Sequence, residues 1–133
     1  MKKHELSRYY YLKLEIRQLE DRIKEIESTT VGSSKITEMP HKKNTKSDPV
    51  ERTVQLISKL KDKLENQKTK ATEELIKINE LIFSIKDSDA RLILTKRYIE
   101  FKRWEKIAYE LGISISSVYR IHRKYVERKW NDR

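Results

Sequence analysis

The stretch WEKIAYELGISISSVYRIHR, residues 104–123, has the spacing of two short helices joined by a tight turn. Ile107, Ala108 and Leu111 are expected on one face of the first helix, with the small Ala where a second helix crosses closely. Gly112 is expected to end this helix, because a residue without a Cβ adopts the positive φ of a tight turn at low cost. The stretch therefore predicts a helix-turn-helix.

The second helix of this stretch is predicted to begin after Ser114, whose hydroxyl can cap it. Val118 and Ile121 lie three residues apart and are expected to face inward. In a helix-turn-helix protein the outward side chains of this helix enter the major groove of DNA. Here that outward strip consists of Ser116, Ser117, Tyr119, Arg120 and Arg123.

Each residue type in the strip suits a contact with DNA. Arg can donate two hydrogen bonds to guanine, Ser can donate or accept one, and Tyr119 can pack on a sugar or a thymine methyl group. Ser114 and the free N–H groups at the start of the helix suit a phosphate. The residues expected to read bases are Ser116, Ser117, Arg120 and Arg123, and those expected to contact phosphates are Lys124 and Arg128.

Positive charge is concentrated at this end of the chain. The sequence has 31 Lys and Arg against 21 Asp and Glu, a net charge of +10, and residues 114–133 hold six cations and two acids. An excess of this size favours a polyanionic partner, and beside a helix-turn-helix it favours double-stranded DNA. The alternative, for a charge run taken by itself, is a solvated basic face.

The composition limits the size of the core and the classes of site. With 133 residues, 39% charged and 36% hydrophobic, the chain is expected to form a small domain with an extension rather than one large globular core. The absence of Cys excludes disulfides, thiolate metal sites and cysteine nucleophiles. No apolar run approaches the roughly 20 residues that span a bilayer, and no signal peptide is recognisable. We therefore expect a cytoplasmic protein with no membrane partner.

Residues 1–28 are predicted to form a helix with a heptad stripe. Such a stripe needs a helical partner, either in another chain, as in a homo-oligomer, or in the same chain, and the pattern favours neither. Residues 29–48 are predicted to form a flexible linker, because the stretch from Ser28 to Pro49 holds both prolines and one of the two glycines among small polar and basic residues. The stripe consists of Tyr9, Leu12, Ile16, Leu19, Ile23 and Ile26.

A second long helix is predicted over residues 49–86. Asp48 is expected to cap it, Pro49 suits its first turn, and Glu51 can close a capping box. Its apolar face is interrupted by Asn-Gln-Lys at residues 66–68, where the coil is expected to weaken or change partner. This face comprises Val50, Val54, Ile57, Leu60, Leu64, Ala71, Leu75, Ile78, Ile82 and Ile85.

Residues 87–133 are predicted to form the helix-turn-helix domain. Residues 87–89, Asp-Ser-Asp, offer a cap for a short helix over residues 90–99. Trp104 opens the next helix and is expected to be a core anchor rather than a DNA contact. The whole chain is thus predicted to be all-α, a long helical hairpin or coiled coil followed by this domain. In the helix over residues 90–99, the side chains expected to face inward are Leu92, Ile93 and Tyr98, with Leu94 a further candidate.

The run RLILTKRYIEFKRWEKIAYELGISISSVYRIHRKYVERKW, residues 91–130, resembles region 4 of bacterial sigma-70 factors in its Arg-Tyr helix, Trp anchor, Ile-Ala, Leu-Gly and Ser. With the long preceding helix, residues 48–130 more closely resemble the ArpU and RinA type of phage late-gene transcriptional regulators. The matching positions are Arg97, Tyr98, Trp104, Ile107, Ala108, Leu111, Ser114, Val118, Arg120 and His122.

The resemblance implies a small activator, encoded by a phage or prophage of Gram-positive bacteria, that binds promoter DNA in the bacterial host cell. It implies DNA contact at Ser114, Arg120 and His122, and a role in the fold for the other matching positions. His122 flanks the outward strip, so a contact with a phosphate and a contact with a base are both open. Sigma region 2 is absent, so promoter melting is not expected. A contact with RNA polymerase is left open.

The sequence offers little for catalysis. Gly32 and Gly112 are too far apart for a phosphate-binding loop, and His4, His41 and His122 share no ligand spacing. We therefore expect no enzyme activity, no metal and no cofactor. The alternative function is that of a phage small terminase subunit, which also joins a helix-turn-helix to oligomerising helices and binds DNA for packaging.

Overall fold

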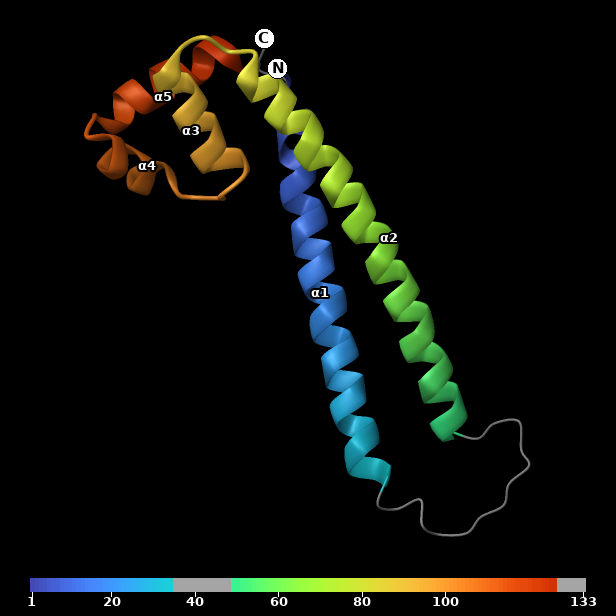
Figure 1. The fold of residues 1–133 in the computed structure, drawn as a ribbon. Helices are drawn as coiled ribbons and strands as arrows, with labels where there is room; N and C mark the ends of the chain where they lie inside the picture. Colours follow the sequence, from blue (N-terminus) through green and yellow to red (C-terminus); the bar gives the residue numbers. More distant parts are fainter. Residues whose placement is uncertain (35–48, 127–133) are drawn as a thin grey trace. The chain divides into compact units, whose positions relative to one another are not determined.

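The computed structural model describes residues 1–34 and 49–126, with side chains described for residues 1–29 and 49–126. These residues form helices and contain no strand (Figure 1), which confirms the all-α prediction. Most of the predicted linker and the predicted phosphate contact Arg128 lie outside the described residues. The helices are α1 (Lys3–Ser34), α2 (Pro49–Phe83), α3 (Ser88–Tyr98), α4 (Trp104–Leu111) and α5 (Ile115–Tyr125).

The chain divides into two compact units. The head unit comprises the described residues 1–13 and 70–126, and the coil unit comprises the described residues between Leu14 and Thr69. Both α1 and α2 contribute to each unit. The division in α2 directly follows the polar residues 66–68 that interrupt its apolar face, although the helix itself continues through them.

In the coil unit, segments of α1 and α2 lie side by side in one chain (Figure 1). Ile16 and Ile23, one heptad apart on α1, are buried. Leu19 and Ile26, from the same predicted stripe, are half-buried. On α2 the predicted apolar face is less covered, since Val54 is exposed.

Polar contacts give the direction of these two segments. Lys61 forms an ion pair of 3.1 Å with Glu27, and Lys68 one of 3.8 Å with Glu20. Residue numbers fall along α2 as they rise along α1, so the segments are antiparallel. The stripe of α1 therefore has a helical partner within its own chain. The two ion pairs are exposed, so each adds only about 0 to 1 kcal/mol to the free energy of unfolding.

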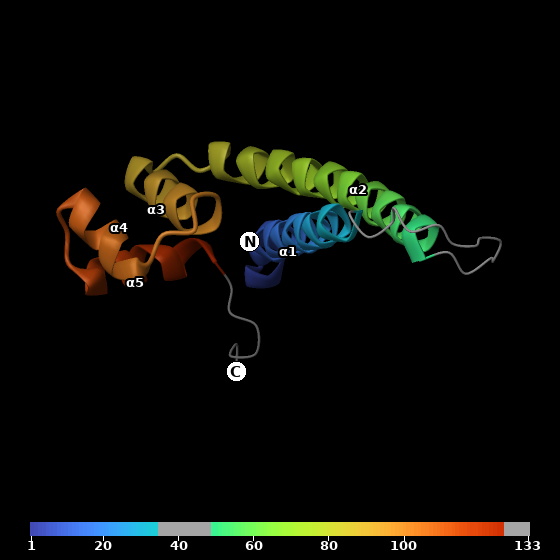
Figure 2. The ribbon, with the colours of Figure 1, turned by 90° about the horizontal axis from the view of Figure 1, so that it is seen from below.

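The head unit is built around α3, α4 and α5, which lie close together (Figure 2). In this unit α5 contacts both α3 and α4. The first turns of α1 belong to the same core, because Leu6 is fully buried. Side chains with almost no exposed surface are Leu6, Ile78, Ile93, Leu94, Ile107 and Val118.

Local signals explain how α3 begins and which side it buries. The Asp87 side chain accepts a hydrogen bond of 3.0 Å from the N–H of Asp89, so the predicted cap is confirmed. The prediction that Leu92 faces inward is wrong, because its side chain is 45% exposed whereas Leu94 is 1% exposed. The buried side chains of α3 are Ala90, Ile93, Leu94 and Tyr98, which occupy one helical face.

Candidate nucleic-acid interface

A tight turn connects α4 to α5. Gly112 ends α4 with φ 70° and ψ 32°, and its N–H donates to the carbonyl oxygens of Ala108 and Tyr109. The N–H of Ile113 donates to the Ala108 oxygen at 3.2 Å, so the Ala108 and Tyr109 carbonyls near the end of α4 are paired. The left-handed conformation predicted for Gly112 is confirmed.

Ser114 caps α5 as predicted. Its Oγ accepts a hydrogen bond of 3.1 Å from the Ser117 N–H and donates one of 3.0 Å to the Ser117 Oγ. The two hydroxyls are therefore hydrogen-bonded to each other at the start of α5. The cap therefore fixes the two serines that begin the proposed recognition helix.

One face of α5 is buried and the opposite face is exposed and basic. Val118 and Ile121 are buried in the head unit, as predicted. The helix contains no acidic residue, and none of its Arg and Lys side chains forms an ion pair within the described part of the chain. The exposed side chains on α5 are Ser116, Tyr119, Arg120, Arg123 and Lys124, whereas Ser117 is half-buried.

Tyr119 is exposed but held in place. Its ring meets the Trp104 ring edge-on, with 5.3 Å between the ring centroids. Trp104 is half-buried, and the Arg97 guanidinium carbon lies 4.4 Å from the centroid of its ring. The Arg97 Nη1 also donates to the Lys102 carbonyl oxygen at 3.0 Å. Trp104 therefore packs against Tyr119 and Arg97, but it is only half-buried and is not one of the buried core residues, unlike the core anchor that the sequence predicts.

His122 differs from the prediction of an outward side chain. It is half-buried, with its ring 4.8 Å from that of Trp104 and stacked on that of Tyr98. The His122 Nε2 and the Tyr98 hydroxyl lie 2.7 Å apart, at hydrogen-bonding distance. Burial raises the pKa of Tyr98 to about 12, so the phenol keeps its proton at neutral pH. Apolar packing and this hydrogen bond turn the His122 ring away from the exposed strip.

A lysine cluster around Glu110 joins α4 to α3 and to the loop between them. Glu110 contacts Lys96 at 2.8 Å and Lys102 at 3.0 Å, and Lys106 lies 3.6 Å away. The hydrogen bonds from Lys96 and Lys102 lower the pKa of Glu110 to about 2. Sequence reasoning missed this cluster, and only the four-residue spacing of Lys106 and Glu110 could have pointed to it.

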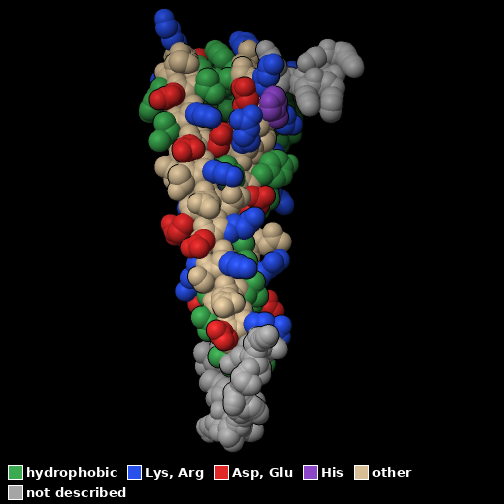
Figure 3. Space-filling view, turned by 90° about the vertical axis from the view of Figure 1, so that its right-hand side faces the viewer, with side chains coloured by type: hydrophobic (Ala, Val, Ile, Leu, Met, Phe, Trp, Pro, Cys, Tyr) green, Lys and Arg blue, Asp and Glu red, His purple; other side chains and the backbone are tan. Residues whose placement is uncertain are grey.

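Charge elsewhere on the molecule is mixed in sign. The face that Figure 3 shows carries acidic and basic side chains interspersed, and α2 has residues of both signs along its length. The absence of acids on α5 therefore sets it apart from the long helices. Within the described residues, no group of three or more His, Asp or Glu side chains could hold a metal ion, and no helix has the length and apolar character to cross a membrane.

Comparison with known proteins places the chain in a family. Residues 32–129 match the model of a family described as proteins of unknown function, DUF1492. The chain belongs to this family. Searches of curated proteins and of solved structures found no match.

The DUF1492 match covers α2, α3, α4 and α5, and so includes the capped turn and the basic face of α5. It begins at residue 32, so the first turns of α1, which complete the core of the head unit, lie before the matched region.

Proposed function

We propose that this DUF1492 protein is a sequence-specific DNA-binding transcriptional regulator that inserts α5 into the major groove. The observation that carries the proposal is the exposed face of α5, where Arg120, Arg123 and Lys124 stand without acidic partners beside Ser116 and Tyr119. A helix of this kind, supported by a second helix across a tight turn, has the arrangement of a helix-turn-helix reader.

The rigidity of the support favours specific contact over a loose basic tail. The Ser114 cap, the Gly112 turn and the Trp104 ring hold the start and the middle of α5. A helix that is already held in place loses less conformational freedom on binding, and correctly spaced donors are needed to distinguish bases in the groove. A role in activating late genes of a phage or prophage, in the cytoplasm of its bacterial host, rests on the resemblance to ArpU and RinA regulators.

His122 enters this proposal in a different role from the one first expected. Its ring nitrogen is engaged with the Tyr98 hydroxyl, so we assign it to holding α5 on α3 rather than to reading a base. Arg120 and Arg123 remain the proposed guanine readers, and Lys124 the proposed phosphate contact.

The test compares Arg120→Ala with Lys124→Ala on an operator selected from random duplexes. Arg120→Ala is expected to cost about 1 to 3 kcal/mol on the operator and little on random DNA, because a bidentate contact with one base is lost. Lys124→Ala is expected to weaken both duplexes alike and to reduce the slope of log K against log salt by about 1.

Arg22→Ala is the matched control, since Arg22 is an exposed arginine of the coil unit with no ion pair among the described residues. Its binding curves should overlay those of the unmodified protein. Equal losses on operator and random DNA for Arg120→Ala would contradict base reading, and salt-independent binding would contradict the proposal as a whole.

A further inference from the structure

A second basic site lies in the head unit, apart from the outward face of α5. An open cavity of about 490 Å³ is lined by the first turns of α1, the end of α3, the following loop and the start of α4. This volume falls within the range of about 300 to 1,000 Å³ that is typical of small-molecule sites. Three cations, Lys3, Arg97 and Arg103, line it, and no Asp or Glu does.

The three cations are available to an anion. Within the described residues none of them forms an ion pair. Arg97 is also fixed in position, because it lies over the Trp104 ring and donates through one Nη1 bond to the Lys102 carbonyl oxygen. A guanidinium has five N–H donors, so this arrangement leaves others for a ligand.

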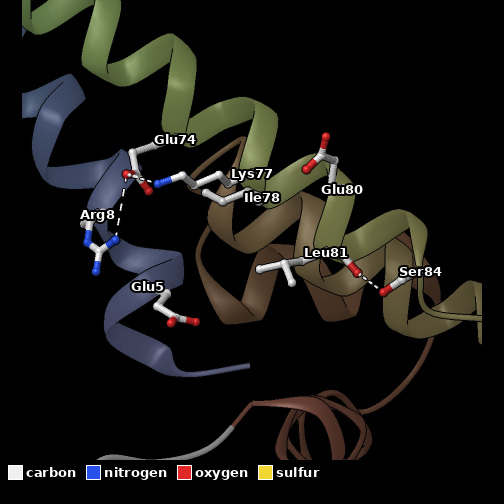
Figure 4. Close-up of a pocket in the computed structure, with 8 residues that line it drawn as sticks. All are labelled: Glu5, Arg8, Glu74, Lys77, Ile78, Glu80, Leu81 and Ser84. Carbon is white, nitrogen blue, oxygen red and sulfur yellow. Dashed lines mark hydrogen bonds and ion pairs between the residues drawn. The ribbon is translucent and has the colours of Figure 1, made fainter.

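A second cavity of the head unit provides a comparison. It has a volume of about 440 Å³, but its cations are neutralised from within (Figure 4). Arg8 and Lys77 both pair with Glu74, at 3.8 and 3.5 Å. Glu5 and Glu80 also line this cavity, so it offers no net attraction to an anion.

Aromatic rings form the other part of the 490 Å³ cavity. Tyr10 and Phe101 are in edge-to-face contact, with 5.1 Å between the ring centroids, and Tyr11 meets Tyr10 at 5.4 Å. Tyr11 is 62% exposed, so it has free ring surface. Trp104 lines the same cavity beneath Arg97.

The backbone at Phe101 is strained in a way that serves this site. Phe101 has φ 60°, which a side chain with a Cβ rarely adopts. The conformation places its ring against both Tyr9 and Tyr10 of α1. Strain of this kind persists only where surrounding contacts over-determine it, and it is concentrated at functional sites.

We propose that this cavity binds a nucleotide, with the base against the aromatic rings and the phosphate held by Lys3, Arg97 and Arg103. Exposed aromatic rings beside unpaired cations are the combination that recognises unpaired nucleotides, since every base has a π face and every phosphate a charge. The nucleotide is either free or an unpaired residue of a nucleic-acid strand, because both present the same chemistry. The site is distinct from the proposed duplex contact on α5.

The experiment is calorimetric titration of the full chain with AMP, adenosine, inorganic phosphate and a thymidine oligonucleotide that forms no duplex. AMP is expected to bind at least about fivefold more tightly than adenosine or phosphate, because stacking on a ring contributes at least about that factor. Tighter binding of AMP than of the oligonucleotide identifies a free nucleotide as the ligand. The reverse order identifies a strand.

Two variants of exposed side chains test the assignment. Arg103→Gln and Tyr11→Leu should each weaken AMP binding at least about fivefold, with circular dichroism and Tm as in the unmodified protein. Lys86→Gln is the control, because Lys86 is an exposed cation of the head unit that does not line the cavity. Its AMP affinity should not change.

The inference is overturned if phosphate binds as tightly as AMP, if neither pocket variant alters AMP binding, or if no probe binds. Arg123→Ala separates it from the proposed function. That variant should weaken operator binding and keep AMP binding. If the unmodified protein binds AMP but no duplex DNA, the proposed function is contradicted and the proposed nucleotide site is supported.

Discussion

Gly112 occupies a backbone conformation that most residues adopt only with strain, at φ 70°. A Cβ built at this position would meet nothing within 4 Å, so the cost of any side chain comes from the backbone alone. We expect Gly112→Ala to lower the free energy of unfolding by about 1 to 2 kcal/mol, measured by urea denaturation.

Gly112→Asn is the comparison for this prediction. Asn tolerates the left-handed region better than Ala, so it should be less destabilising. If the two variants lose equal stability, or Asn loses more, the conformational explanation is contradicted.

Glu110 should make the stability of the head unit depend on pH in the acid range. Hydrogen bonds from Lys96 and Lys102 lower its pKa from an ordinary 4.5 to about 2. A carboxyl whose pKa is lowered by folding stabilises the folded state above its unfolded pKa, and this contribution is lost as the pH falls through the folded pKa. The Tm of the unmodified protein should therefore exceed that of Glu110→Gln by a constant margin from pH 7 to pH 5.

The difference in Tm between the unmodified protein and Glu110→Gln should shrink between about pH 4.5 and 2, which are the unfolded and folded pKa values of Glu110. Glu105→Gln is the control, since Glu105 is an exposed acid on the same helix with no ion pair among the described residues. A margin between Glu110→Gln and the unmodified protein that does not change with pH would mean that Glu110 acts by packing rather than by charge.

For single residues, the sequence predicts the structural role where that role depends on near neighbours in the chain. Gly112 ends a helix and Ser114 caps one within three residues, so periodicity and residue type suffice. The orientation of His122 depends on Tyr98, 24 residues away, and the strain at Phe101 depends on rings of α1. Neither of these long-range contacts produces a periodic pattern in the sequence from which it could be predicted.

Among the elements, α5 begins at a side-chain cap that a single substitution removes. Ser114→Ala removes the acceptor for the Ser117 N–H and should lower the free energy of unfolding by about 1 kcal/mol. It should also weaken DNA binding, because the start of the helix frays. Thermal and urea denaturation measure the first effect, and duplex titration measures the second.

Ser116→Ala is the matched control for stability, since Ser116 is exposed on the same turn and makes no cap contact. Ser116→Ala should leave the free energy of unfolding unchanged. A loss of stability equal to that of Ser114→Ala would assign the effect to the loss of a hydroxyl in general rather than to capping.

The element least accessible to prediction was α1. The sequence predicts its heptad stripe, but a single stripe is compatible with a partner in the same chain or in another chain. In the structure its first turns belong to the head unit and its later turns to the coil unit. Leu6, which was not assigned to the stripe, is fully buried. What a stripe contacts is decided by tertiary packing, which periodicity alone does not specify.

For the whole molecule, the arrangement of the long helices bears on assembly. The buried stripe positions of α1 in the coil unit already have a partner in the same chain, so they are not free to form an intermolecular coiled coil. We therefore expect light scattering to give the mass of a monomer or a dimer. A dimer should protect paired half-sites about one helical turn apart.

A ring of eight or more subunits would instead favour the small terminase alternative and contradict the proposed regulator. Measuring the mass by light scattering with and without the operator duplex distinguishes a dimer that exists in solution from one that assembles on DNA. A dimer that protects a single half-site would contradict the symmetric arrangement.

The position of Trp104 has a practical consequence. Its indole touches Tyr119 on the proposed duplex face and Arg97 in the proposed nucleotide site. The chain has two tryptophans, so replacing Trp130 with Phe leaves Trp104 as the only indole emitter. The emission of Trp104 should then report binding at the proposed duplex face and at the proposed nucleotide site without an added label.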